Sequence, residues 1–441
     1  MGSYIPASKA DQQRMLEALG LTAIDQLFDS IPQDLRNPHI PIPAGMSEME
    51  TAHAITEIAA KNHIFASIFR GAGAYDHYIP SVVKRITTKE EFLTAYTPYQ
   101  AEISQGVLQS IFEYQTMICE LTGMDVSNAS VYDGASAAAE AMGMCRERKR
   151  QRVLVAETCN PQTLLTIETY CFASDVEVCV VPAINGLTDM EALQEMLDDD
   201  VAGFYLQQPN FFGLVEDAQA LGEAVHAAGA KYVLGVHPFA SMLYPSAREY
   251  GADIAVGEGQ PLGMPLSYGG PYLGFMACTN ALVRRLPGRV VGETTDHDGR
   301  RAFVLTLQAR EQHIRREKAS SNICSNQAHC ALAAAVYISA MGADGMRQVA
   351  EQCYAKAHYL ASHLCEIPGV ELVHSPHDFF NEFVTSLPIA EETVLAALEE
   401  KGILGGYPVD GGLLWCVTEK NSRQHIDRLV AIVKEVCARV S

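Results

Sequence analysis

The sequence predicts an α/β protein in which a mainly parallel sheet is covered by helices on both faces. Short apolar stretches recur through the middle of the chain, and helical patterns separate several of them. These stretches lack the polar alternation of a half-exposed strand, so both faces of each strand should be buried. Because a helix that joins two such strands brings them together in parallel, a sheet between two helical layers is the class that fits.

The N-terminal part departs from this pattern. Its first 45 residues have helical character and end in Pro38-His39-Ile40-Pro41-Ile42-Pro43. Prolines at this density favour extended backbone. We expect residues 1–70 to form a helical arm and a strap that lies over the body of the protein or over a partner.

Alternating helices and strands begin at about residue 103. Apolar residues spaced three or four positions apart predict helices, and Gly123 is positioned to end the first of them. The predicted helices are Ile103–Thr122, Ala137–Lys149, Thr188–Leu197 and Glu216–Ala228. The predicted strands are Arg152–Ala156, Val176–Val181, Gly203–Leu206, Tyr232–Val236, Ile254–Val256 and Leu273–Ala277.

A chain of 441 residues is long enough for two or three domains. We expect residues 71–315 to form the large domain, and residues 316–441 to form a linking helix and a small C-terminal α+β domain. The longest apolar run, Cys330–Ala343, predicts a buried helix because it is too short to span a bilayer. An amphipathic pattern predicts a final helix at His425–Val440.

Composition and charge argue against several functional classes. The formal net charge of −21 repels nucleic-acid backbones. Residues Met1 to Gly20 carry charges and no continuous apolar core, so a secretory signal is not expected. Twelve cysteines are scattered without a C-x-x-C pair, which argues against a disulfide framework or a zinc ribbon. We expect a cytoplasmic protein with no membrane segment and no bound metal.

Short motifs leave few enzyme classes open. H-E-x-x-H, G-x-S-x-G and Walker A motifs are absent. Gly257, Gly259 and Gly263 miss the dinucleotide fingerprint by one position. The turn Asp133-Gly134-Ala135-Ser136 opens a predicted helix, either as a phosphate cradle or, as the pattern favours, as an ordinary entry capped by Ser136 or Asp133. Gly269-Gly270-Pro271 permits close approach to a ligand or another subunit, or a tight turn.

Two further groups of side chains each have two explanations. Tyr75, His77, Tyr78, Tyr96 and Tyr99 suit either a polar pocket or packing at an interface. A group of arginines either docks an anion or carboxylate or, as we slightly favour, forms intersubunit or surface pairs with acids. The arginines are Arg284, Arg285, Arg289, Arg300, Arg301, Arg310, Arg315 and Arg316, and the acids are Glu293, Asp296, Asp298, Glu311 and Glu317.

Longer motifs occur in five segments, Gly71–Pro80, Tyr96–Gly106, Gly257–Pro271, Asn322–Gln327 and Asn381–Phe383. They resemble the glycine cleavage system P-protein family, and within it the alpha subunit (subunit 1) of the two-chain bacterial glycine dehydrogenase (decarboxylating). The resemblance covers essentially the whole chain, and motifs of this length are far more specific than a glycine fingerprint. Ser320-Ser321 is a small departure that keeps the hydroxyl group of the family's threonine.

The resemblance implies a fold-type-I pyridoxal-phosphate (PLP) transferase, with a large parallel-sheet domain and a smaller C-terminal domain. It also implies an alpha–beta heterodimer that is usually doubled into a heterotetramer. The implied reaction is decarboxylation of glycine on PLP held by the beta subunit, where the cofactor ring is an electron sink for the carbanion. The aminomethyl group then passes to the lipoyl arm of H-protein, which is reduced.

Two groups that PLP chemistry requires are missing from this chain. The stretch Tyr232–Glu317 contains no lysine, and Pro261 stands at the family's Schiff-base position. His237 stands where catalytic members have the aspartate that pairs with the pyridine nitrogen, and it supplies no fixed negative charge. The resemblance therefore implies a chain without a Schiff-base residue, inactive without its beta partner.

Other residues are expected to complete the partner's site. Ser267, Tyr268, Gly269 and Gly270 are expected to reach the partner's cofactor phosphate. The residues expected to shape the entry for glycine or the lipoyl arm are Tyr78, Tyr96, Tyr99, Gln100 and Asn322.

Two other interpretations stay open. An autonomous PLP enzyme would use Lys231 or Lys318, although Lys231 begins a predicted strand and ligand sites lie at carboxyl ends. A structural or regulatory scaffold would keep an inactive pocket, against which the polar aromatic group argues.

Overall fold

The computed structural model describes residues 7–36, 41–95, 97–268, 270–319 and 321–439. The chain divides into two compact units, Met1–Ile64 and Phe65–Ser441. The first unit contains α1 (Lys9–Ala18), η1 (Ile24–Phe28), η2 (Gln33–Leu35) and α2 (Glu48–Ala59). The predicted strap at 38–43 lies partly outside the described residues.

Capping boxes begin both α-helices of the first unit. The Ser8 hydroxyl accepts a hydrogen bond from the Asp11 N–H, and the Asp11 carboxylate accepts one from the Ser8 N–H. Ser47 and Glu50 make the same exchange at the start of α2. Each box satisfies two backbone donors that the first helical turn leaves free.

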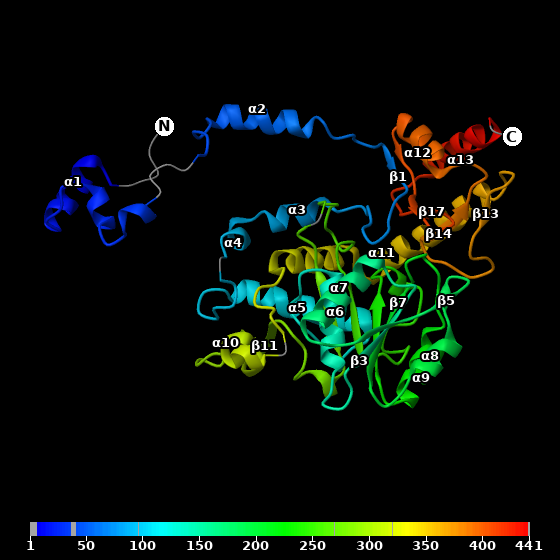
Figure 1. Ribbon diagram of the computed structural model, residues 1–441, viewed down its shortest axis with the longest axis horizontal. Coiled ribbons are helices and arrows are strands. Elements are labelled where there is room, and N and C mark those ends of the chain that lie inside the picture. Colours follow the sequence, from blue (N-terminus) through cyan, green and yellow to red (C-terminus); the bar gives the residue numbers. More distant parts are fainter. Residues whose placement is uncertain (1–6, 37–40, 96, 269, 320, 440–441) are drawn as a thin grey trace. The chain divides into compact units, whose positions relative to one another are not determined.

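A seven-stranded sheet forms the centre of the second unit in the described part of the chain (Figure 1). Its order is β2-β10-β9-β8-β7-β3-β4, and the strands from β9 to β4 are parallel. β10 runs antiparallel to both of its neighbours. The bounds are β2 (Val126–Ser127), β3 (Arg152–Ala156), β4 (Val178–Val181), β7 (Val201–Gln208), β8 (Lys231–Val236), β9 (Ile254–Glu258) and β10 (Gly274–Cys278). The prediction of a mainly parallel sheet is confirmed.

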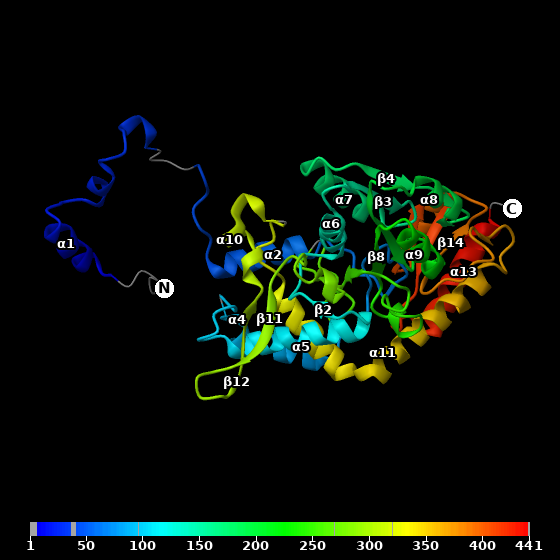
Figure 2. The same cartoon turned by 90° about the horizontal axis from the view of Figure 1, so that it is seen from below.

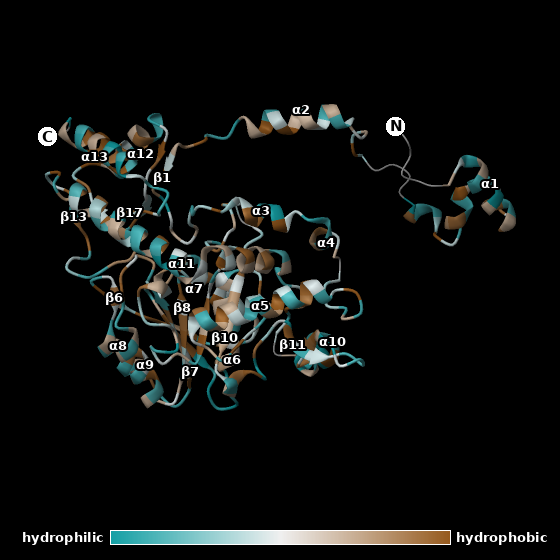
Figure 3. Ribbon diagram, turned by 180° about the vertical axis from the view of Figure 1, so that it is seen from behind, coloured by the Kyte–Doolittle hydropathy of each residue, from teal (hydrophilic) through white to brown (hydrophobic). Residues whose placement is uncertain are grey.

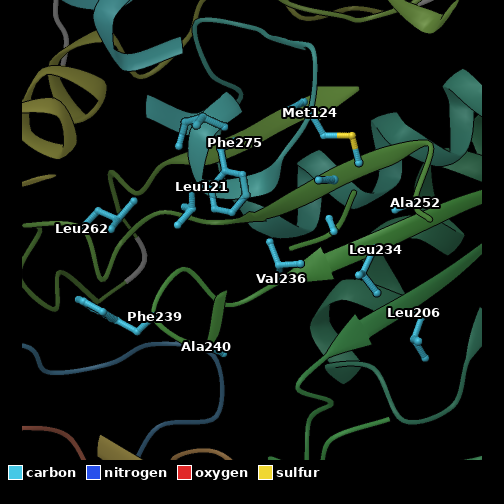
Figure 4. Packing of buried hydrophobic residues seen from close by; sticks show 14 of the residues in the cluster. Leu121, Met124, Leu206, Leu234, Val236, Phe239, Ala240, Ala252, Leu262 and Phe275 are labelled. Carbon is cyan, nitrogen blue, oxygen red and sulfur yellow. The ribbon is translucent and has the colours of Figure 1, made fainter. Parts of the chain in front are cut away.

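Alternate residues of each strand enter different hydrophobic cores. Leu154 belongs to the core that also contains α5 and α11 residues, whereas Val153 and Val155 belong to the core that contains α6 and α7 residues. Figure 3 shows the strands at the centre of this unit in the hydrophobic colours. Figure 4 shows Leu206, Leu234 and Val236 within the first of these two cores. Burial on both faces explains why the strand sequences are uninterrupted apolar runs.

The predicted helices around the sheet are present with shifted ends. α6 was expected at Ala137–Lys149 but spans Gly134–Cys145, because Asp133 caps it and Arg146 is already extended (φ −60°, ψ 137°). α5 ends at Gly123, which has the predicted left-handed conformation (φ 72°). The helices and short helical turns are α3 (Ser81–Thr87), α4 (Glu90–Leu93), α5 (Gln105–Thr122), α7 (Pro161–Ala173), α8 (Met190–Met196), α9 (Ala218–Ala227), η3 (Ala240–Met242), η4 (Asn280–Leu282), η5 (Gln308–Arg310), α10 (Gln312–Arg315) and η6 (Arg316–Lys318).

The C-terminal part has its own small sheet and core. Its strand order is β13-β14-β17-β16, all antiparallel, and Trp415 and Phe383 are buried between this sheet and the last two helices. The elements are β13 (Glu371–Leu372), β14 (Glu382–Ser386), α12 (Glu391–Glu400), β16 (Tyr407–Val409), β17 (Gly412–Cys416) and α13 (Arg423–Ala438). Three short pairs complete the second unit, β1 (Ser67–Ile68) with β15 (Ile403–Leu404), β5 (Ala183–Ile184) with β6 (Leu187–Thr188), and β11 (Val290–Thr295) with β12 (Arg301–Thr306).

One long helix, α11 (Ala328–Leu364), contributes to both the main core and the C-terminal core. Figure 2 shows it changing direction partway along. The kink is at Gly342, whose φ of 63° and ψ of 175° are not helical. In the part of the chain that the structure describes, no helix is both long and apolar enough to cross a membrane.

Replacing Gly342 should weaken the fold through backbone strain alone. A Cβ at this position would meet no atom within 4 Å, but its conformation is one that only glycine adopts readily. We expect Gly342→Ala to lower the free energy of unfolding by about 1–3 kcal/mol. The matched control is Gly345→Ala in the same helix, which should be neutral or stabilising by up to about 1 kcal/mol. Equal effects of the two variants in urea denaturation would contradict this explanation of the kink.

Candidate functional site

One candidate site is a cavity of about 690 Å³ at the carboxyl ends of β7, β8 and β9. Ligands of open α/β sheets bind at this edge because the loops that follow the strands converge there. Segments far apart in the sequence line it, including Gly73–Tyr75, the start of α6, His237, the loop 270–272 and Glu382.

The N-terminus of α6 is the obvious place for an anion in this cavity, because its first N–H groups have no partner within the helix. Here the chain's own carboxylates use two of those donors. The Gly134 N–H donates to Glu258 at 2.9 Å, and the Ser136 N–H donates to Asp133 at 2.7 Å. The ordinary capped entry predicted from the sequence is confirmed, with Asp133 as the cap.

Glu258 joins three separate segments. Its carboxyl group accepts hydrogen bonds from the N–H groups of Gly134, Gln260 and Leu273, at 2.9, 2.9 and 3.1 Å. Burial raises its pKa to about 7, although those three donors favour the charged form. A Cβ on Gly134 would lie 2.9 Å from the Glu258 backbone nitrogen, so only glycine permits this approach.

His237 follows β8 and lines the same cavity as a neutral donor. Its Nδ1 accepts hydrogen bonds from the N–H groups of Phe239 and Ala240, at 3.2 and 3.4 Å. Nδ1 is therefore unprotonated, and Nε2 carries the hydrogen and has no partner among the described residues. Burial, helped by the nearby His77, lowers the pKa of His237 to about 3. The imidazole consequently stays uncharged at neutral pH.

No lysine is among the described residues that line this cavity. Pro261 is buried in a turn in which the Leu262 N–H donates to the Gly259 carbonyl at 2.9 Å. Lys231 is the first residue of β8, at the opposite end of that strand from His237. Lys318 lines a different cavity. Neither of the alternative Schiff-base lysines is positioned to serve this pocket.

These residues do not fit PLP. A cofactor phosphate at α6 would meet the carboxyl groups of Glu258 and Asp133 on donors that they already use. A protonated pyridine nitrogen needs an anionic acceptor, whereas His237 offers a neutral N–H. The cavity lies where a PLP site would lie in this fold, but its carboxyl groups and its neutral histidine do not match the groups of the cofactor.

A second buried carboxyl group, that of Glu382, forms hydrogen bonds with the segment Gly71–His77, part of which lines the cavity. It accepts hydrogen bonds from the Ala72 N–H and the Tyr75 hydroxyl, both at 2.7 Å. The side-chain amide of Gln260 accepts a hydrogen bond from the Tyr75 N–H and donates one to the Tyr75 carbonyl, both at 2.9 Å. Burial raises the pKa of Glu382 to about 7. Hydrogen bonds thus join the loop after β9, the segment Gly71–His77 and β14.

Residues 76–78 also form hydrogen bonds and an ion pair with the C-terminal part. His77 Nδ1 lies 2.7 Å from Glu419, which also accepts the Tyr78 N–H at 2.6 Å, and Asp76 pairs with Lys420 at 2.6 Å. His77, Cys353 and Glu419 are the one group of potential metal ligands within 4.8 Å of one another among the described residues. The hydrogen bond between His77 and Glu419 already explains their proximity.

The residues predicted to serve a partner's site do not gather in this cavity. Tyr78, Gln100 and Asn322 are exposed away from its lining, and the Tyr99 hydroxyl donates to Asn326 with the Arg289 guanidinium 5.1 Å from its ring. Tyr268 is 98% exposed with a φ of 48°, Ser267 is half-buried, and Gly270 lines the cavity with a φ of 137°. Tyr96 and Gly269 lie outside the described residues.

Sequence reasoning missed Glu258, Glu382 and Gln260. Each lies in or beside a motif noted above, but each has a partner that is 124 to 310 residues away. For Glu258 and Gln260 the available signal was an acid and an amide among glycines, just after a strand predicted to be apolar.

Ionisation of Glu382 should make the fold less stable at high pH. Its folded pKa of about 7 exceeds its ordinary value of 4.5, so the protonated form is favoured in the fold and stability falls as pH rises between these values. In Glu382→Gln the amide cannot ionise, and its NH₂ group can donate to the Tyr75 oxygen. We expect about 2 kcal/mol less stability loss between pH 5.5 and 8 than in the wild type.

Denaturant unfolding at the two pH values measures this difference. The exposed Glu400→Gln variant is the control and should keep the wild-type pH dependence. An unchanged pH dependence in Glu382→Gln would show that the carboxyl group is ionised across this range.

Comparisons with known proteins agree with this geometry. The model of the family "Glycine cleavage system P-protein" matches residues 2–433. The probable glycine dehydrogenase (decarboxylating) subunit 1 of Moorella thermoacetica is 50% identical over 99% of this chain and all of that protein. The protein of the same name from Desulforamulus reducens is 50% identical over 97% of this chain and 98% of its own length.

Solved structures confirm the fold class. A crystal structure of glycine decarboxylase (P-protein) in inhibitor-bound form is 41% identical, with a TM-score of 0.93 over 99% of this chain and all of that one. Sphingosine-1-phosphate lyase from Burkholderia pseudomallei is 13% identical, with a TM-score of 0.68 over 92% of this chain and 93% of its own, and shows the fold-type-I architecture alone. The chain belongs to the glycine cleavage system P-protein family.

Proposed function

We propose that this chain is subunit 1 of a two-subunit glycine dehydrogenase (decarboxylating) and works only in complex with a subunit 2 that holds PLP. The full-length relatives named subunit 1 support the assignment. The observation that carries the dependence on a partner is the cavity at the sheet edge. Two N–H groups at the start of α6, those of Gly134 and Ser136, already donate to Glu258 and Asp133, and no lysine is among the described lining residues of the cavity.

In this proposal the loop between β9 and β10 reaches the site of the partner. Two features support it. Tyr268 projects into solvent instead of packing against its own chain, and it has a positive φ, which is uncommon for tyrosine. Gly270 also has a positive φ and borders the cavity. Ser267 through Gly270 would approach the cofactor phosphate of the partner.

Tyr99, Gln100 and Asn322 are proposed to shape the entry for glycine or for the lipoyl arm of H-protein, together with Tyr78 and Tyr96. The hydrogen bond from Tyr99 to Asn326 joins two of the family motifs and orders the segment that contains Asn322. Burial raises the pKa of Tyr99 to about 12, so its hydroxyl remains a donor at any physiological pH.

The N-terminal unit is proposed to contact a partner. Met49, Ile55 and Ile58 of α2 are 79%, 60% and 59% exposed. Apolar side chains grouped on one short helix are typical of interaction surfaces. The division into an arm (1–70), a large domain (71–315) and a C-terminal part (316–441) and the cytoplasmic location stay predictions.

Reconstitution tests the proposed role. With PLP and glycine, the isolated chain should release no carbon dioxide above background, whereas its complex with subunit 2 should be active. A scaffold would raise the stability of subunit 2 without changing its turnover per folded site. Activity of the isolated chain, or unchanged turnover per site in the complex, would contradict the proposal.

Two substitutions test the assigned residues. Gly270→Ala strains a φ of 137° in the loop proposed to reach the cofactor, and we expect exchange of glycine carboxyl with bicarbonate to fall roughly tenfold or more. Tyr99→Phe removes the hydroxyl that bonds Asn326 and should lower the exchange several-fold. Tyr407→Phe, an exposed tyrosine of the small sheet, is the control. Wild-type exchange rates in both test variants would remove these assignments.

A further inference from the structure

A second cavity, of about 320 Å³, is rich in positive side chains. Nine residues line it, and five of them are cations, namely Arg284, Arg285, Arg310, Arg315 and Lys318. Glu140 is the one acidic residue among them. The whole chain has 53 acidic and 32 basic residues, so five cations around one acid reverse its overall charge balance.

These cations are not neutralised by the chain itself. Arg284 and Lys318 make no hydrogen bond or ion pair among the described residues. Neighbouring arginines differ, because Arg289 pairs with Glu311 and Arg301 pairs with Glu293, as the sequence predicted. Within this chain, the expected pairing is therefore present for Arg289 and Arg301, whereas no ion pair is formed by the arginines that line the cavity among the described residues.

The remaining arginines are held in place by backbone carbonyl groups, which leaves their charge available. Arg310 donates to the carbonyls of Leu286 and Gly288, and Arg285 donates to that of Arg146. Arg315 donates to the Ala309 carbonyl at 3.1 Å. A guanidinium fixed in this way keeps other N–H groups free to bind an oxyanion without losing much side-chain entropy.

The single acid opposes an anion only weakly. Glu140 is buried and accepts a hydrogen bond from Ser321 at 2.9 Å. Burial raises its pKa to about 7, so near neutral pH a substantial fraction is protonated.

We propose that this cavity is a binding site for a multiply charged oxyanion, a phosphate or diphosphate group of a small molecule. Several free cations exceed what a monocarboxylate would neutralise, and Arg forks match phosphate geometry. The volume is within the range of small-molecule pockets. The site does not depend on the proposed glycine chemistry, because its lining shares no residue with the cavity at the sheet edge.

Calorimetric titration of the full-length chain with pyrophosphate tests the site, at about 0.15 M salt to screen weak surface binding. We expect saturable binding to one site per chain. Arg284→Ala with Lys318→Ala removes two cations that make no described contact, so the fold should be kept. Binding should weaken roughly tenfold or more. The control removes two exposed cations of α3, Lys84→Ala with Arg85→Ala, and should change the dissociation constant less than about twofold.

Three outcomes would overturn the proposal. The first is the absence of saturable binding up to about 10 mM, and the second is equal weakening in the test and control variants. The third is binding by the isolated chain that disappears in its complex with subunit 2, because acidic groups of the partner would then be the occupant. Binding that persists in the complex supports a small-molecule site.

Discussion

The hydrogen bonds of Glu258 decide what the main cavity of this protein can do. One carboxyl group joins the start of α6, the turn after β9 and the residue that precedes β10. It occupies the Gly134 N–H, one of the donors through which this helix would hold a phosphate, and Asp133 occupies the Ser136 N–H. The pocket has the place in the fold of a PLP site, but two carboxyl groups at the helix start, a neutral His237 and a buried Pro261 do not fit the cofactor.

Other polar groups around the cavity also form their hydrogen bonds with groups of this chain. Glu382 and Gln260 bind the backbone and hydroxyl group of the Gly71–His77 segment. Buried carboxyl groups with a raised pKa lower stability at high pH, yet each is retained where it joins elements distant in sequence. The cavity is therefore held in shape by the protein itself, which suits a subunit that supplies a surface to a partner.

Much of the fold could be predicted from the sequence, because burial on both faces forces uninterrupted apolar strands. The antiparallel direction of β10 could not, since an apolar run does not encode strand direction. The early end of α6 was missed because Arg146 leaves the helix through its backbone although the sequence continues a helical pattern. For the site, the sequence alone predicted the absence of a lysine and the positions of His237 and Pro261. Glu258 and Glu382 were not, because their partners meet only in the folded chain. The sequence indicated the arginine group but not which of its members pair with acids of the same chain, because that is decided by how the loops fold.

Borohydride trapping in the assembled complex tests the central claim most directly. The complex with subunit 2 would be incubated with PLP, reduced and digested, and the labelled peptides would be identified by mass spectrometry. The account predicts one label per pair of subunits, on a lysine of subunit 2, and none on this chain. A stoichiometric label on Lys231, Lys318 or any other lysine of this chain would contradict it.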